Sequence, residues 1–365
     1  MSLKAGIVGL PNVGKSTLFN AITKKNILVA NYPFATIEPN VGIVTVPDER
    51  LTKLEEIYIP EELKPATFEF VDIAGIVKGA SLGEGLGNKF LSHIREVDAI
   101  VEVVRCFDDK EITHVDGSVN PIRDVEVINL ELALADLEII NNRIDKIKKK
   151  AETTKEKETV LEYNALTKAK ETLEKDIPLR LADFMKDEMF AIKGFNFLTL
   201  KPHIYLANIS ENEIKLENDY VKKLKEYAKG ENSKVIVVSA KIESELAELE
   251  DSDKEEMLKD LGIEKSGLDK LIEESYNLLG LKTYFTCGPK EVKAWTYKDG
   301  MNAKECAGII HSDFEKGFIK AEVISYNDLI EAGSELKVKE NGKFRIEGKE
   351  YLMQDGDICH FRFNL

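Results

Sequence analysis

The chain has 365 residues, of which 43% are hydrophobic and 32% charged, and it carries a formal net charge of −15. This length and composition exclude a mini-protein and a disordered chain, and they suggest two or three domains. The negative charge argues against nonspecific wrapping of nucleic acid, so no DNA partner is expected. Residues 281–365 are nearly neutral, which makes this part the better candidate for any electrostatic contact with RNA.

No apolar run approaches the ~20 residues that a bilayer span requires, and the N-terminus has no signal-peptide pattern. We therefore expect a cytoplasmic protein without a membrane partner. The four cysteines are scattered and form no CxxC pair, which predicts reduced thiols rather than a zinc site or a disulfide framework. They are Cys106, Cys287, Cys306 and Cys359.

Short apolar runs rich in β-branched residues predict strands along much of the chain. Several of these runs are almost continuously apolar, as is typical of strands buried on both faces of a mainly parallel sheet. The predicted fold is therefore a doubly wound α/β domain. The runs are residues 5–8, 42–46, 67–73, 99–104, 204–207 and 234–238.

A different pattern separates the fourth and fifth predicted strands. Apolar residues recur every three or four positions over 127–147 and again over 160–173, with a polar stretch between them. This spacing predicts two α-helices that form a hairpin inserted in the α/β domain. The basic residues Lys146 and Lys148 to Lys150 end the first helix, where they either complement the helix dipole or contact RNA.

After a last predicted helix over 268–281, the sequence changes to short alternating segments with turns such as Asn341-Gly342. A separate small α+β module is expected to begin near Thr283. We therefore assign residues 1–128 and 200–281 to two parts of the α/β domain, 129–199 to the helical insertion and 282–365 to the module.

The segment Gly9 to Ser16 reads GLPNVGKS and fits the phosphate-binding pattern GxxxxGK[ST]. It follows a predicted strand and precedes a predicted helix, which is the context that the motif of a P-loop NTPase requires. Backbone N–H groups would surround the phosphates, Lys15 would reach the β- and γ-phosphates, and the Ser16 hydroxyl would bind Mg²⁺. The expected nucleotide contacts here are Asn12, Val13, Gly14, Lys15, Ser16 and Thr17.

A second motif supports a site for a triphosphate with magnesium. The predicted strand 67–73 leads into Asp72-Ile73-Ala74-Gly75, a DxxG pattern in which the carboxylate helps to hold Mg²⁺ and the glycine N–H meets the γ-phosphate. Thr36 lies between the two motifs and would close on Mg²⁺ when a triphosphate is bound, which defines a switch loop. The expected metal ligands are Ser16, Thr36 and Asp72, and Lys15 and Gly75 are expected to act on the γ-phosphate.

These motifs and three further segments resemble the YchF family, also called Obg-like ATPases. The segments are Asn31 to Thr36, Lys78 to Ala80 and Gly83 to Asn88, and the stretch from Thr283 to Phe318 is similar to the ubiquitin-like TGS domain of that family. The resemblance covers almost the whole chain. It implies a P-loop NTPase domain with a helical insertion and a C-terminal TGS domain, a role near the ribosome, and ATP as the preferred nucleotide.

In guanine-binding relatives, an NKxD motif after the fifth strand selects the base, and the corresponding residues here are Asn208-Ile209-Ser210-Glu211. Ile209 replaces the lysine and the longer Glu211 replaces the aspartate, so the carboxylate that selects guanine is displaced. Asn208 can still pair with adenine. The loop Ser239-Ala240-Lys241 points the other way, because its alanine N–H normally donates to guanine O6 and would face the amino group of adenine. We predict ATP, with GTP or mixed use as the alternative.

Many relatives carry a glutamine directly after DxxG that orients the attacking water. This chain has Ile76 there, which can neither accept nor donate a hydrogen bond. The resemblance implies that His114 takes the water-positioning role instead. In some relatives an asparagine at the position of Asn12 helps to hold a potassium ion, so K⁺ is a second candidate, and the sequence leaves both open.

Two functions fit these motifs. The first is an ATPase whose slow turnover is accelerated by a partner such as a ribosomal subunit. The second is a binding module in which bound ATP or ADP sets the geometry of the switch loops and hydrolysis only resets it. RNA contact is plausible through the helical arm and the TGS domain, although the latter could be a passive structural module. A static assembly protein is disfavoured because Lys15, Ser16, Thr36 and Asp72 are all present.

Overall fold

The computed structural model describes residues 3–24, 40–73, 86–109, 111–114, 117–154 and 156–364. The chain divides into two compact units, one formed by Met1–Gly42 with Glu69–Lys270 and the other by Ile43–Phe68 with Leu271–Leu365. The four-part division expected from the sequence stays a prediction.

A mainly parallel sheet of six strands, in the order β2-β4-β1-β5-β6-β7, carries the predicted nucleotide site. The parallel register places Ile7 of β1 beside Asp72 of β4 and Gly9 of β1 beside Val103 of β5. The carboxyl ends of these strands therefore meet at one edge of the sheet, and the predicted α/β fold is confirmed. The strands are β1 (Lys4–Gly9), β2 (Val41–Thr45), β4 (Thr67–Asp72), β5 (Ala99–Arg105), β6 (His203–Asn208) and β7 (Lys234–Val238).

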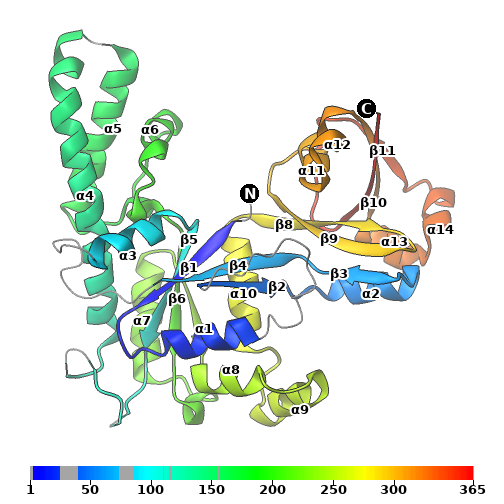
Figure 1. The fold of residues 1–365 in the computed structure, drawn as a ribbon, viewed down its shortest axis with the longest axis horizontal. Helices are drawn as coiled ribbons and strands as arrows, with labels where there is room; N and C mark the ends of the chain where they lie inside the picture. The colour runs from blue at the N-terminus through cyan, green and yellow to red at the C-terminus, as the bar shows by residue number, and fades with distance from the viewer. Residues whose placement is uncertain are drawn as a thin grey trace. The chain divides into compact units, whose positions relative to one another are not determined.

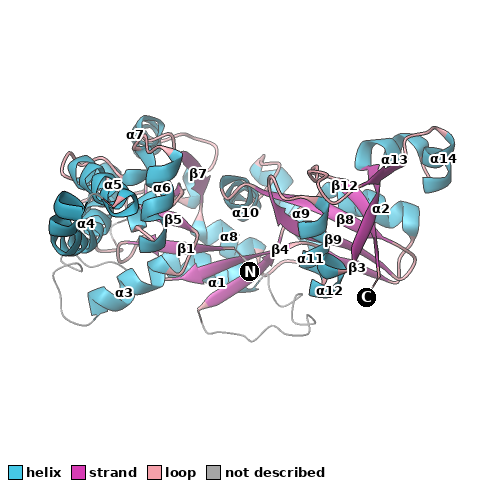
Figure 2. Ribbon diagram, turned by 90° about the horizontal axis from the view of Figure 1, so that it is seen from above, coloured by secondary structure: helices cyan, strands magenta, loops and turns pink. Residues whose placement is uncertain are grey.

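Helices flank these strands on both sides (Figure 2). On one face, Val104 of β5 and Tyr205 of β6 belong to the same buried cluster as Val221 and Leu224 of α7. Burial of strand side chains beneath helices accounts for the continuously apolar runs in the sequence. The helices of this unit outside the insertion are α1 (Lys15–Lys24), α3 (Leu86–Arg95), α7 (Asp219–Gly230), α8 (Ala240–Leu246) and α9 (Asp251–Leu261), and α10 (Gly267–Leu278) leads on to the second unit.

The predicted helical hairpin is present as α4 (Pro121–Thr154) and α5 (Lys157–Leu173), which lie side by side in Figure 1. Arg143 and Glu162 join the two helices through a double contact, with Nε–Oε1 at 2.5 Å and Nη2–Oε2 at 3.0 Å. The carboxylate of Asp136 in α4 accepts the backbone N–H groups of residues 198 and 199. No helix within the described part of the chain combines the length and the apolar character needed to traverse a bilayer.

The second unit contains a mixed sheet in the order β11-β10-β12-β8-β9-β3. Its edge strand β3 comes from the segment between β2 and β4, and it pairs in parallel with β9, with Leu63 beside Val292. The strands are β3 (Glu62–Lys64), β8 (Leu281–Cys287), β9 (Glu291–Lys298), β10 (Phe318–Ser325), β11 (Arg345–Glu347) and β12 (Asp357–Phe363); the helices are α2 (Glu49–Tyr58), α11 (Ala303–Ile310), α12 (Ser312–Lys316), α13 (Tyr326–Ala332) and α14 (Glu335–Glu340).

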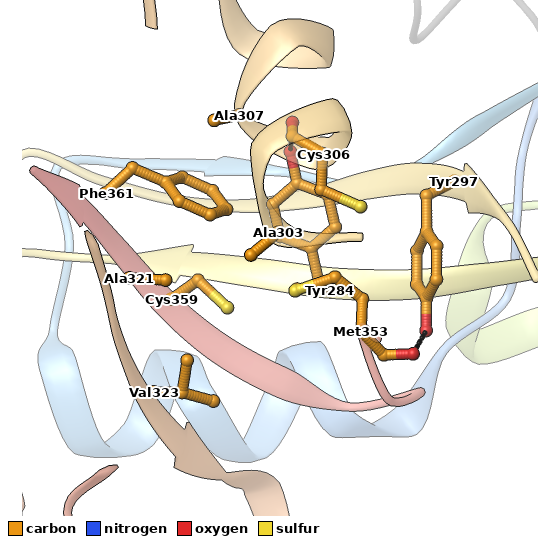
Figure 3. Packing of buried hydrophobic residues seen from close by; sticks show 10 residues of the cluster. All are labelled: Tyr284, Tyr297, Ala303, Cys306, Ala307, Ala321, Val323, Met353, Cys359 and Phe361. Atoms are coloured by element: carbon orange, nitrogen blue, oxygen red, sulfur yellow. Dashed lines mark hydrogen bonds between the residues drawn. The ribbon is translucent and has the colours of Figure 1, made fainter. Parts of the chain in front are cut away.

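Two tyrosines organise the core of this unit (Figure 3). The Tyr284 hydroxyl donates to the carbonyl of Cys306 at 2.9 Å and the Tyr297 hydroxyl to the carbonyl of Met353 at 3.1 Å. These bonds satisfy hydroxyl groups that burial would otherwise leave unpaired. All four cysteines are free, as predicted, and burial raises the pKa of the Cys306 thiol to about 12.

A buried histidine and glutamate connect β5 and β6 in the larger sheet. His203 Nε2 lies 2.9 Å from Glu102 Oε2, and within the described residues the other oxygen of Glu102 and Nδ1 of His203 have no hydrogen-bond partner. Burial raises the pKa of Glu102 well above 4.5, and burial, together with the charge of Arg180, lowers the pKa of His203 well below 6.5. The folded pair therefore holds one proton.

This shared proton makes stability depend on pH. Above pH 6.5 the unfolded pair holds no proton, so folding takes one up and stability falls as pH rises; below pH 4.5 the unfolded pair holds two, so stability falls as pH drops. The slope on each side approaches about 1.4 kcal/mol per pH unit. In Glu102→Gln only His203 of this pair titrates. The free energy of unfolding then no longer falls as the pH rises above 6.5, and its decrease toward acid pH begins near pH 6.5. Urea unfolding across this range measures both limbs, and an unchanged profile in the variant contradicts the shared proton.

Candidate functional site

The predicted phosphate-binding loop lies between β1 and α1 and has the backbone shape that the motif requires. Asn12 and Gly14 both adopt left-handed conformations, with φ of 65° and 94°. A Cβ atom on Gly14 would stand 2.3 Å from Nδ2 of Asn208, so only glycine fits at this position. The first turn of α1 follows at once, with Leu18 N donating to Gly14 O at 3.0 Å. The loop therefore leads directly into a helix N-terminus, which favours anions.

The structure brings together two of the residues predicted to bind phosphate and metal, Lys15 and Asp72. The Lys15 ammonium forms an ion pair with the carboxylate of Asp72, which ends β4. Ser16 and Thr17 are exposed in the first turn of α1. A carboxylate and a hydroxyl beside one lysine are oxygen ligands of the kind that Mg²⁺ takes together with phosphate oxygens. The predicted roles of Thr36 and Gly75 fall outside the described residues.

Asn208 connects this loop to the predicted base-binding region. It is buried at the end of β6, its Nδ2 donates to Val13 O at 2.8 Å, and its Oδ1 accepts the N–H of Ala240 at 2.9 Å. One donor and one acceptor position of the amide are thus used inside the protein. An amide offers a second N–H and a second acceptor lone pair, so Asn208 could still pair with a purine. That contact stays a prediction.

The bond from Ala240 bears on the choice of base. Its N–H, the group that donates to guanine O6 in guanine-binding relatives, donates here to Asn208 Oδ1. Among the remaining predicted base contacts, only Ile209 lies apart. Ile209 is buried in the cluster beneath α7, and Lys241 pairs with Glu211 at 2.5 Å, beyond Ser239, the residue that precedes α8. The side chain of Ile209 therefore does not join the others.

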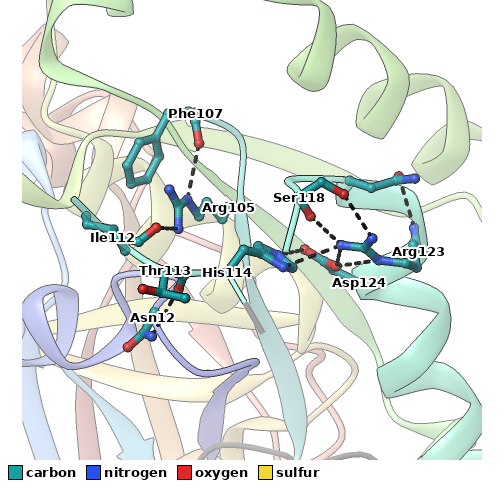
Figure 4. Close-up of polar contacts among 10 residues, drawn as sticks. Asn12, Arg105, Phe107, Ile112, Thr113, His114, Ser118, Arg123 and Asp124 are labelled. Carbon is teal, nitrogen blue, oxygen red and sulfur yellow. Dashed lines mark hydrogen bonds and ion pairs between the residues drawn. The ribbon is translucent and has the colours of Figure 1, made fainter. Parts of the chain in front are cut away.

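A hydrogen bond connects the loop that carries His114 to the phosphate-binding loop. Asn12 Nδ2 donates to the carbonyl of Thr113 at 3.2 Å (Figure 4). Arg105, which is fully buried at the end of β5, donates from its guanidinium to the carbonyl groups of Phe107, Asp109 and Ile112 at 3.0–3.2 Å. A single arginine thus holds the carbonyl groups of the loop that leads to His114.

His114 itself is buried, and both of its ring nitrogens face polar groups of α4. Nε2 lies 2.9 Å from Asp124 Oδ2, and Nδ1 lies 3.4 Å from Nη2 of Arg123, as Figure 4 shows. Sequence reasoning singled out His114 but missed Arg105, Arg123 and Asp124. The one available signal was Arg105, a charged residue that directly follows an apolar strand pattern.

A parallel sheet with this loop between its first strand and first helix, and an aspartate at the end of the adjacent strand, defines a P-loop NTPase. The family model MMR_HSR1, described as "50S ribosome-binding GTPase", matches residues 4–165, and the model YchF-GTPase_C, described as "Protein of unknown function (DUF933)", matches residues 281–364. The chain is 59% identical to the "Ribosome-binding ATPase YchF" of Bacillus subtilis (strain 168) and 54% identical to that of Pasteurella multocida (strain Pm70), in each case over all of both chains. The chain belongs to the YchF family.

Solved structures agree with this assignment. The "Structure of the Schizosaccharomyces pombe YchF GTPase" is 43% identical and superposes with a TM-score of 0.91 over 99% of this chain and 98% of that one. A structure titled as a GTP binding protein from Pyrococcus horikoshii OT3 is 21% identical, with a TM-score of 0.62 over 99% of this chain and all of that one, and it shares the fold. The doubly wound domain, the helical insertion and the C-terminal module are therefore those of the family.

Proposed function

We propose that the protein is a magnesium-dependent ATPase that associates with the ribosome and acts in the cytoplasm as a nucleotide-controlled switch. The observation that carries this proposal is the ion pair of Lys15 with Asp72 at the phosphate-binding loop, next to Ser16 in the first turn of α1. The bacterial relatives, at least 50% identical over the full length, are named ribosome-binding ATPases. These names suggest the partner and the nucleotide. The partners are thus ATP or ADP and a ribosome or ribosomal subunit, with RNA contact through the helical arm or the C-terminal module.

The residues of the site have distinct proposed roles. Ser16 and Asp72, joined by Thr36, would hold Mg²⁺, which neutralises phosphate charge when it is bound. Lys15 would exchange Asp72 for the β- and γ-phosphates, and the Gly75 N–H would meet the γ-phosphate. Asn12 donates through Nδ2 to Thr113, which leaves its Oδ1 as the oxygen that a potassium ion requires. His114 would position the attacking water.

Adenine is favoured over guanine at the base site. The engagement of the Ala240 N–H by Asn208 removes the donor that would select guanine O6 and would oppose the amino group of adenine. GTP is the second candidate, because the solved fission-yeast relative is titled a GTPase whereas the bacterial relatives are named ATPases.

Parallel affinity measurements test this assignment. We expect the purified protein to bind ATP more tightly than GTP at millimolar Mg²⁺, by about 5- to 150-fold, since one buried unpaired polar group costs about 1–3 kcal/mol. Omission of Mg²⁺ should weaken triphosphate binding, and turnover measured with and without K⁺ decides whether Asn12 holds that ion. Tighter binding of GTP, or no binding of either nucleotide, contradicts the proposal.

A further inference from the structure

A cavity of about 460 Å³ lies at the root of the helical hairpin. One wall is the face of α4 that carries Glu126, Asn129, Leu130 and Ala133, which follow the spacing of neighbours on a helix surface. The turn after α5 and the end of α7 supply the other walls. All these segments belong to the same compact unit, and no described residue of the lining is a predicted nucleotide contact.

The lining of this cavity is strongly acidic. Glu126, Asp176 and Glu231 contribute carboxylates, and no lysine or arginine is among the described residues that line it. Glu231 already accepts hydrogen bonds from Arg180 and Tyr205, at 2.5 and 2.6 Å. Within the described part of the chain, Glu126 and Asp176 form no ion pair. Two carboxylates therefore remain available to a cation from outside.

The helices around the cavity add to its negative potential. Helix α5 ends at Leu173, three residues before Asp176, and α7 ends at Gly230, directly before Glu231. The C-terminal end of a helix carries a partial negative charge, which repels carboxylates and attracts cations. Two helix ends and three carboxylates thus favour a positive charge at this place.

The arrangement suits an organic cation rather than a metal ion. A metal requires several oxygen ligands around one point, and among the described residues no group of three carboxylate, histidine or cysteine side chains meets that requirement. The carboxylates lie instead on separate walls, one on α4, one after α5 and one after α7. A side chain that enters between these walls can reach them with several N–H donors.

Apolar side chains border the same cavity. Leu130 is 50% exposed and Ile177 is 40% exposed, with Ala133 and Pro178 beside them in the lining. Lysine and arginine pack the methylene groups of their side chains against apolar surface while the charged head binds oxygen. A peptide that carries a lysine or arginine next to an apolar residue would therefore cover Leu130 and Ile177 and neutralise the carboxylates.

We propose that the root of the helical hairpin is a docking site for a basic protein segment of the ribosomal partner, with a lysine or arginine side chain in the cavity. The choice of a ribosomal source rests on the proposed function. RNA is disfavoured as the occupant here, because its phosphates would meet unpaired carboxylates and two negative helix ends. Charge complementarity thus assigns protein, rather than RNA, to this part of the helical arm.

Reversal of the cavity's charge tests the proposal on the full-length protein with purified ribosomes. In Glu126→Lys and in Asp176→Lys we expect ribosome affinity, measured by cosedimentation, to fall about 3- to 30-fold, because an attraction becomes a repulsion. ATP affinity and turnover should stay at the wild-type values. Glu138→Lys is the matched control, since Glu138 is exposed on α4 but does not line the cavity, and it should bind ribosomes as the wild type does.

A second measurement is independent of ribosomes. The peptide acetyl-Leu-Lys-Leu-amide is titrated while NMR follows labelled methyl groups of Leu130 and Ile177, with acetyl-Leu-Glu-Leu-amide and spermidine titrated in the same way. We expect the lysine peptide to shift both signals and the glutamate peptide to leave them in place. The double variant Glu126→Gln with Asp176→Asn keeps the size of both side chains, and in it the shifts should disappear.

Several outcomes overturn the inference. Tighter ribosome binding by the lysine variants identifies RNA at the cavity, and equal weakening in Glu138→Lys shows only a general effect of charge. Absence of methyl shifts with the lysine peptide, or binding of spermidine alone, excludes a protein segment. If the wild type binds no ribosomes but the lysine peptide shifts the methyl signals, the proposed function fails while the cavity remains a site for a basic segment.

Discussion

Replacement of Lys15 by alanine is expected to weaken ATP binding about 100-fold or more, because it removes a charge-assisted contact with the β- and γ-phosphates worth roughly 3 kcal/mol. The lysine side chain is largely buried against Asp72 in the structure, so alanine also leaves that carboxylate without its cation. Mg²⁺ alone would then have to balance the triphosphate. Calorimetric titration with ATP and Mg²⁺ measures the loss.

Lys24→Ala is the matched control for this variant. Lys24 ends the same helix, α1, and forms an ion pair with Glu248 on the exposed surface. Such a surface pair contributes about 0–1 kcal/mol to stability, so ATP affinity should stay at the wild-type value. Undiminished ATP binding in Lys15→Ala contradicts the assignment of the phosphate site.

His114→Ala is expected to lower the turnover of ATP about 100-fold and to leave ATP affinity nearly unchanged. A group that acts only in the transition state lowers kcat without altering ground-state binding, and positioned groups of this kind contribute about 100- to 10,000-fold. Single-turnover hydrolysis and a parallel binding titration separate the two effects. His311→Ala alters an exposed histidine of the second unit and should hydrolyse ATP at the wild-type rate.

The same variant distinguishes the enzyme from the switch. His114→Ala should still bind ATP, so it holds the triphosphate state for longer than the wild type does. If association with ribosomes follows the bound nucleotide and does not depend on turnover, occupancy of the nucleotide site controls the function. If association requires turnover, the cycle of ATP hydrolysis controls the function. Cosedimentation with ribosomes in ATP and in ADP gives the answer.

Local patterns predicted most of the larger sheet and its site. The short apolar runs rich in β-branched residues predicted all six strands of this sheet. The sequence GLPNVGKS located the loop whose Gly14 has no room for a Cβ atom. Helical periodicity also found the hairpin, although α4 begins at Pro121 rather than near residue 127. The start was missed because a buried polar residue, Asp124, interrupts the apolar pattern before residue 127.

Long-range partners could not be predicted in this way. Strand β3 has only three residues and no apolar run, and its partner β9 lies more than 200 positions away. Asp124 reaches His114 across a turn, and Arg105 folds back onto three carbonyl groups. No periodicity encodes such contacts, because they depend on where a loop returns in space.

The origin of strand β3 has a practical consequence for dissection of the protein. A fragment comprising residues 282–365 would contain β9 but lack both β3 and helix α2, since these come from residues 49–64. The outer backbone groups of β9 would then be exposed as an unpaired edge, which favours self-association in solution. Arg50 and Tyr58 would also be lost, and with them the ion pair to Asp355 and the hydrogen bond to Glu335. Truncation at a boundary chosen from the linear order of the chain therefore removes part of the very module that it aims to isolate.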